Sequence, residues 1–203
     1  MNNPIIHDKQ VYEYVVVIQP NEDLQGRISQ VRREFNVLYR VEHPLLSNVH
    51  VPLVYFTQNI GFQDKIIRRF RLLAMRSHPF KIRLNNFDSF PTYTIFISGT
   101  EKNQFQEFVK TLRTDSQELL KMDELHKPNF ILEPYIPIAI KLLPWQYERG
   151  WLQYSNVNFN ASFIADSIVL LKRRQGEIKY FPVQSFNLMN LEPVTKQASI
   201  FDT

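Results

Sequence analysis

The chain has 203 residues and no cysteine, and 24 lysines and arginines against 20 acidic residues leave a formal charge of +4. The lack of cysteine excludes zinc ribbons, iron–sulfur sites and cysteine nucleophiles, and so small a charge argues against a nonspecific nucleic-acid binder while allowing a nucleotide or RNA partner. No apolar stretch approaches the roughly 20 residues of a transmembrane helix. Residues 1–4 lack the features of a secretory signal, so we expect a cytoplasmic protein without a membrane span.

The first half of the chain alternates strand and helix patterns. Residues 12–18 are a β-branched run that predicts a buried strand. The helix that follows carries an apolar stripe made of Leu24, Ile28, Val31, Phe35 and Leu38. Arg32 is predicted to lie mostly off this stripe. A second strand is predicted over residues 49–56, and a second helix over residues 62–77.

The second half continues with strands, one helix and a further strand–helix pair. Strands are predicted over residues 80–84 and 93–97, as a hairpin or as neighbouring strands. A helix marked by Phe105, Phe108, Val109 and Leu112 follows, and then a strand over residues 135–142. A helix with Pro144 in its first turn precedes two further strands, over residues 164–172 and 179–188. No Gly/Ser-rich linker divides the chain. We therefore expect one bilobal domain over residues 1–190 and a loose C-terminal tail over residues 191–203.

Two pentads, one in each half, share a pattern. His50-Val51-Pro52-Leu53-Val54 and Tyr135-Ile136-Pro137-Ile138-Ala139 each read as a ring, a β-branched residue, proline, an aliphatic residue, and a small or aliphatic residue. Proline inside a strand is unusual because it cannot donate to the ladder. Its presence at the same offset twice predicts that both strands border something other than another strand.

On these pentads the chain resembles the 2H phosphoesterases, or 2'-5' RNA ligase-like family, whose signature is His-x-Thr/Ser on two strands lining a cleft. Further matches over residues 14–20, 80–84, 163–171 and 180–188 follow the family's order of strands. The resemblance implies an α+β fold with two pseudo-symmetric lobes, each a mostly antiparallel sheet backed by helices, around a central cleft.

In the family, the resemblance implies, one histidine is the general base, the other is the general acid, and the two hydroxyls hold the phosphate. Here His50 stands at the first histidine position, Tyr135 at the second, and Pro52 and Pro137 replace the hydroxyls. Losing a general acid removes about 100- to 10,000-fold of rate. The resemblance therefore points to a divergent, catalytically degenerate member, a pseudoenzyme that binds a nucleotide, RNA end or small ligand in the cleft.

Strand alternation assigns the cleft-facing residues. It places four residues of the first strand on one surface of the cleft, namely His50, Pro52, Val54 and Phe56. Four residues of the second strand lie on the facing surface, namely Tyr135, Pro137, Ala139 and Lys141. Such a cleft is more apolar than a phosphate site, although Lys141 can supply one charge. The candidate catalytic residues are His50 and Tyr135, and the candidate substrate-binding residues are Pro52, Pro137 and Lys141.

Other interpretations remain open. The protein is alternatively an active cyclic phosphodiesterase-like hydrolase, with His50 as base and Tyr135 or Lys141 in altered roles, or a protein–protein scaffold if prolines and aromatic side chains fill the cleft. His50 and Tyr135 can also be packing residues without chemistry. The densest basic region comprises Arg68, Arg69, Arg71, Arg76, Lys81 and Arg83, either a solvated face or an RNA contact. No histidine spacing indicates a metal, no cofactor motif is present, and no oligomeric state is predicted.

Overall fold

The computed structural model describes residues 10–42, 45 and 48–191. The predicted C-terminal tail lies outside these residues except for Leu191. The elements are β1 (Val11–Ile18), α1 (Glu22–Leu38), β2 (Val51–Asn59), the 3-10 turn η1 (Ile60–Phe62), α2 (Gln63–Arg76), β3 (Phe80–Phe90), β4 (Thr94–Thr100), α3 (Lys102–Leu120), β5 (Asn129–Phe130), β6 (Tyr135–Ala139), α4 (Pro144–Tyr154), β7 (Asn160–Ala165), β8 (Ser167–Arg174) and β9 (Phe181–Asn187).

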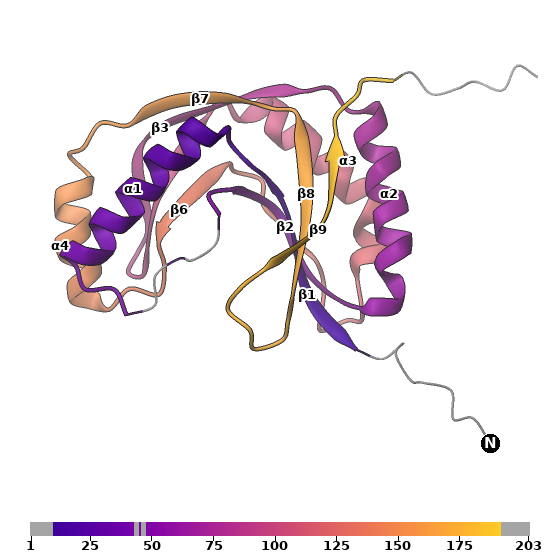
Figure 1. The fold of residues 1–203 in the computed structure, drawn as a ribbon, viewed down its shortest axis with the longest axis horizontal. Coiled ribbons are helices and arrows are strands. Elements are labelled where there is room, and N and C mark those ends of the chain that lie inside the picture. The colour runs from indigo at the N-terminus through magenta and orange to yellow at the C-terminus, as the bar shows by residue number, and fades with distance from the viewer. Residues whose placement is uncertain (1–9, 43–44, 46–47, 192–203) are drawn as a thin grey trace, which may run out of the picture.

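Two antiparallel sheets build the two lobes. The first sheet has the strand order β5-β2-β1-β8-β9 and the second β6-β4-β3-β7. The strands form an arch, with α1 and α4 at its left end and α2 and α3 at its right end (Figure 1). Helix α2 packs along β9, α1 and α4 pack against β6 and β4, and α3 contacts β2 and β3, one strand from each sheet. The α+β, two-lobed fold predicted from the sequence is confirmed.

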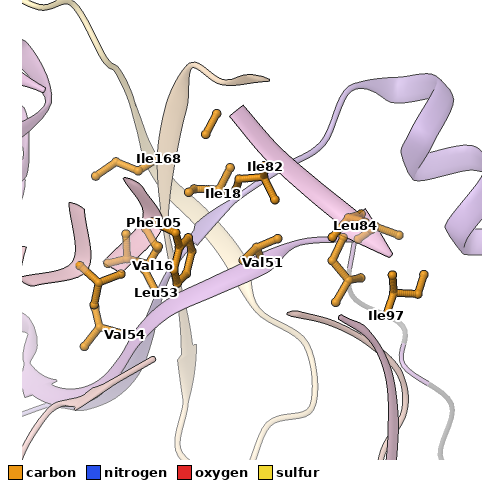
Figure 2. Close-up of a cluster of buried hydrophobic side chains, with 14 of the residues drawn as sticks. Val16, Ile18, Val51, Leu53, Val54, Ile82, Leu84, Ile97, Phe105 and Ile168 are labelled. Atoms are coloured by element: carbon orange, nitrogen blue, oxygen red, sulfur yellow. The ribbon is translucent and has the colours of Figure 1, made fainter. Parts of the chain in front are cut away.

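A continuous buried cluster joins the lobes. It contains Val16 and Ile18 of β1 together with Ile82 and Leu84 of β3, so both sheets supply side chains to one core (Figure 2). Phe105 of α3 lies in the same cluster and is almost completely buried. Burial of this apolar surface holds the two sheets against each other.

The buried face of helix α1 contains residues other than those predicted. The Asn21 side chain accepts a hydrogen bond from the Leu24 amide at 3.1 Å and caps the helix. Arg32, predicted mostly off the apolar stripe, is buried within it, whereas Leu38 is 57% exposed. The reason is spacing, because position 32 lies four residues after the buried Ile28 and shares its side of the helix.

The predicted strand over residues 164–172 is two strands in different sheets. β7 pairs with β3 in the second sheet, and β8 pairs with β1 in the first. Asp166 separates them, and its carbonyl accepts a hydrogen bond from the Leu188 amide at 2.8 Å. Apolar runs over residues 163–165 and 168–171 lie on both sides of the polar pair Asp166-Ser167. Two polar residues are too short a break for the hydrophobic pattern alone to mark a crossing between sheets.

Candidate functional site between the two pentads

The pentads occupy equivalent places in the two lobes. β6 is the edge strand of the second sheet, and beyond β2 in the first sheet lies only the two-residue β5. β5 pairs with Val54 and Tyr55 and does not reach Pro52. Strands β2 and β6 contact each other where the lobes meet. The prolines thus lie where no strand on that side requires their missing amide hydrogen.

A β-bulge interrupts β2 directly after its proline. Val54 pairs with Val16 and Pro52 pairs with Val17, which leaves Leu53 without an opposite residue on β1. A bulge reverses the alternation of side chains beyond it. Pro52 therefore lies on the face opposite to that of Val54.

The same irregularity recurs in β6. Ala139 pairs with Ile95 and Pro137 pairs with Phe96, which leaves Ile138 unpaired against β4. Leu53 and Ile138 hold the same position in their pentads. The weak sequence repeat thus corresponds to a repeated backbone feature.

The bulges correct the predicted cleft faces. Regular alternation through each pentad is wrong, because the extra residue moves the later positions to the other side. Val54 and Phe56 are buried in the main core rather than beside Pro52, and Ala139 is buried there rather than beside Pro137. Pro52 instead shares a face with Tyr55, since their partners Val17 and Val15 both point away from the main core.

We call the surface between the lobes the inner face. In the first lobe it contains a small buried cluster that is separate from the main core and consists of Val15, Val17, Val169 and Leu171. Tyr55 and Tyr180 pack against this cluster. In the second lobe Tyr135 packs against Phe96 and Phe90, with ring centroids 5.3 and 5.5 Å apart. The inner face is therefore largely apolar and aromatic, unlike a phosphate site.

One ion pair among the described residues lies beside the tyrosines of the inner face. The Arg173 guanidinium binds the Glu13 carboxylate, with Nε to Oε2 at 2.6 Å, and lies 4.5 Å from the centre of the Tyr180 ring. Burial, together with the nearby hydroxyl of Tyr135, raises the pKa of Tyr55. The pKa of Tyr135 is raised as well, so both phenols are neutral at neutral pH.

His50 is held in a neutral form. Its side chain is 6% exposed, and its Nδ1 lies 2.7 Å from the Asn48 carbonyl oxygen. Because a carbonyl can only accept, Nδ1 carries the proton, and Nε2 keeps its lone pair. Burial lowers the pKa of His50 to about 4, and the nearby charge of Arg32 acts in the same direction. At neutral pH this imidazole has no acidic proton to give a leaving group.

Tyr135 is a poor replacement for an acidic histidine. Burial is the main cause that raises its pKa above the ordinary value, and Tyr93 adds to it. A phenol that holds its proton more tightly is a weaker general acid near neutral pH. Its ring contacts with Phe90 and Phe96 make Tyr135 part of an aromatic cluster.

Lys141 lies away from the predicted position. It follows the end of β6, is exposed, and has a left-handed backbone with φ of 54°. The next residue, Leu142, donates its amide to the Tyr93 carbonyl at 3.1 Å. The prediction that strand alternation carries Lys141 onto the Tyr135 face is wrong, because both the bulge and this turn intervene.

Arg32 is the site residue that the pattern missed. Its Nε donates to the Pro137 carbonyl at 3.0 Å, so a helix of the first half binds the pentad of the second. Burial lowers the pKa of Arg32 to about 10, which leaves it charged at neutral pH. The available signal was an arginine at a stripe position between Ile28 and Phe35.

Replacing Arg32 tests this contact. We expect Arg32→Met to lower the free energy of unfolding by about 1–3 kcal/mol, because the carbonyl of the half-buried Pro137 loses its bond to the Arg32 guanidinium. The same change should raise the pKa of His50, since a neighbouring positive charge is removed. Urea unfolding and NMR titration of His50 measure the two effects. The control is Arg33→Met, an exposed neighbour, and equal effects of the two changes would contradict the assignment.

The predicted basic region is divided. Arg68, Arg69, Arg71 and Arg76 lie on the exposed side of α2, whereas Lys81 and Arg83 lie on β3. Asp115 of α3 binds Arg76, and its carbonyl accepts from Arg69. Among the described residues no group of three histidine or acidic side chains is arranged to hold a metal, and no helix there has the length and apolar character to cross a bilayer.

Known proteins match both the sequence and the fold. A family model for the 2'-5' RNA ligase superfamily matches residues 20–177. The structure of TT0787 from Thermus thermophilus is 15% identical, with a TM-score of 0.68 over 89% of this chain and 100% of that one. E. coli LigT complexed with 3'-AMP is 14% identical, with a TM-score of 0.64 over 88% of this chain and 99% of that one. No curated protein matches the chain.

Proposed function

Because the chain belongs to the 2'-5' RNA ligase superfamily, we propose that it is a catalytically degenerate member that binds a nucleotide, an RNA end or a similar small ligand at the inner face. Its candidate residues remain His50, Tyr135, Pro52 and Pro137. The observation that carries this proposal is the lack of an acid–base pair at the two pentads.

Concerted cleavage of a phosphodiester needs one group that takes a proton and another that gives one. His50 is neutral, with a pKa of about 4, and is a weak base near neutral pH. Tyr135 has a raised pKa and releases its proton reluctantly. Pro52 and Pro137 offer no hydroxyl to a phosphate oxygen. Each of these features lowers turnover, and together they favour binding without chemistry.

Aromatic side chains supply the means of binding. A nucleobase stacked on an aromatic ring gains about 1–3 kcal/mol, and Tyr55, Tyr135 and Tyr180 all belong to the inner face. E. coli LigT has been crystallised with 3'-AMP and with NADP+, which shows that the same fold accommodates nucleotides in that protein. In this chain the ligand's base and ribose, rather than its phosphate, would make most of the contacts.

One observation favours a working hydrolase as the second candidate. The hydrogen bond from Nδ1 of His50 to the Asn48 carbonyl leaves Nε2 as an acceptor, which is the tautomer that a general base requires. In that case His50 would take the proton, and Tyr135 would assist the leaving oxygen.

A hydrolysis panel separates the two candidates. Purified protein is incubated with 2',3'-cyclic nucleotides and cyclic-phosphate-ended RNA, without added metal, beside His50→Ala and His50→Asn at equal concentration. The control variant is His78→Ala, which changes an exposed histidine in the turn before β3. We expect no turnover above background in any sample. Turnover by the wild type and His78→Ala that both His50 variants lose would establish the hydrolase instead.

Calorimetric titration with 3'-AMP then tests binding. We expect saturable binding by the wild type that Tyr135→Ala weakens about tenfold, the loss of one stacking contact. If the protein shows neither turnover nor binding, the proposal is wrong, and the inner face is better explained as a surface that packs against a protein partner.

A further inference from the structure

An open pocket, which we call the cavity, lies on the surface outside the inner face. It lies between the C-terminal half of α3, the loop over residues 121–128, and β5, and its volume is about 390 Å³. Small-molecule sites typically span about 300–1,000 Å³. The cavity is therefore large enough for a compact ligand.

Cations dominate its wall. Arg113, Lys121 and Lys127 line the cavity, and Glu118 is the one carboxylate among the lining residues. Positive side chains gathered around a small volume favour an anionic occupant.

Two of these cations already hold a carboxylate. Lys121 and Lys127 both bind Glu124, with Lys127 Nζ 3.0 Å from Oε2. The Glu124 side chain is 74% exposed and does not line the cavity. Because exposed ion pairs contribute only about 0–1 kcal/mol, an external anion can displace Glu124 from the two ammonium groups at little cost.

The loop that carries the lysines is folded before any ligand arrives. The Asp123 carboxylate accepts hydrogen bonds from the amides of Leu125 and His126, each at 2.8 Å. The Met122 amide donates to the His126 carbonyl at 3.3 Å and closes the turn. Such preorganisation lowers the entropy lost on binding.

Phe130 adds an aromatic side chain to the lining of the cavity. Phe130 is fixed by the pairing of β5 with β2, where it lies opposite Val54. The Arg113 guanidinium lies 6.0 Å from the centre of its ring. A benzene ring and a guanidinium plane both accept a stacked planar group.

We propose that this cavity binds a small anion that bears a planar ring. Lys121 and Lys127 hold the anionic group, the ring lies against Phe130 and Arg113, and Glu124 competes with the ligand for the lysines. This site is separate from the inner face and does not depend on the function proposed there.

Three probes separate the contributions of charge and ring. Calorimetry or NMR titration of the full chain uses phenyl phosphate, methyl phosphate and phenol. We expect phenyl phosphate to bind at least tenfold more tightly than either partial probe, since each of the other two lacks one set of contacts. Phe130→Leu should remove the preference for phenyl over methyl phosphate.

Charge variants locate the probe. Lys121→Ala and Lys127→Ala should each weaken phenyl phosphate binding by up to about fivefold, the upper value of an exposed ion pair. Lys110→Ala, which changes an exposed lysine of α3 outside the cavity, should leave binding unchanged. Glu124→Gln should strengthen binding several-fold because it releases both lysines. All four positions are on the surface, so the fold is retained.

Three outcomes of the probe and charge-variant experiments would overturn the proposal. They are the absence of saturable phenyl phosphate binding, equal affinities of Lys121→Ala, Lys127→Ala and Lys110→Ala, and weaker binding by Glu124→Gln. Tyr135→Ala distinguishes this cavity from the inner face. It should leave phenyl phosphate binding unchanged, and loss of binding in that variant would place the probe at the inner face and also overturn the proposal.

Discussion

Lowering the pH from 7 to 4 is expected to reduce the free energy of unfolding by about 3 kcal/mol through His50 alone. In the unfolded chain its pKa is near 6.5, and in the folded protein burial lowers it to about 4. Between these values the unfolded chain binds more protons, so stability falls as the pH falls. The contribution is complete above the unfolded pKa and is lost as the pH approaches the folded one.

Urea unfolding of the wild type and His50→Asn at pH 7, 5.5 and 4 measures this contribution. Asparagine keeps a donor near the position of Nδ1 but does not titrate, so the difference between the two pH profiles belongs to His50. His78→Ala, which changes an exposed histidine, should retain the wild-type profile. Parallel profiles for the wild type and His50→Asn would show that His50 is accessible to protons in the folded protein.

Gly99→Ala is expected to destabilise the protein by about 2–4 kcal/mol. A Cβ at this position would lie 2.4 Å from Cγ and 2.6 Å from the carbonyl oxygen of Pro134. That carbonyl accepts the Gly99 amide at 2.8 Å, directly before Tyr135 begins β6. The added methyl must push the two strands apart, which combines an overpacking cost of about 1–3 kcal/mol with a weakened hydrogen bond.

Gly26→Ala is the matched control. Gly26 lies in α1, and a Cβ there meets no atom within 4 Å. Alanine in a helix interior is favoured over glycine by about 0.5–1 kcal/mol, so this variant should be slightly more stable than the wild type. Thermal and urea unfolding compare the two glycines. A Gly99→Ala protein as stable as the wild type would mean that β4 and β6 separate freely at this point.

Most helices and strands were predictable because their signals are local. Leu24, Ile28 and Phe35 of the predicted apolar stripe are buried in α1, and Pro144 begins α4 as its position predicts. Two arrangements were predicted for the strands over residues 80–84 and 93–97, a hairpin or neighbouring strands, and the structure has the antiparallel hairpin of β3 and β4. β3 extends beyond the predicted end at residue 84. Asn86 adopts a left-handed conformation with φ of 56°, and the pairing with β4 resumes after it with a shifted register, so the strand does not end there.

The candidate site was predictable only in part. The family and the two pentads followed from residue identities, and the family model confirms the resemblance. The faces of the pentads did not follow, because a bulge is defined by which residue of the neighbouring strand lies opposite. Arg32 was missed for a related reason, since the Pro137 carbonyl that accepts its hydrogen bond lies 105 positions away.

The sequence by itself determined the fold class, the family and the chemical groups missing from the two pentads, because these depend on periodicity and residue type. Only the tertiary structure decided how acidic His50 is, which side chains cover the inner face, and that Lys121 and Lys127 converge on one cavity. Burial and charge proximity are properties of the assembled chain. A pattern of residues can specify which groups are present, but the packing of distant segments decides their environment.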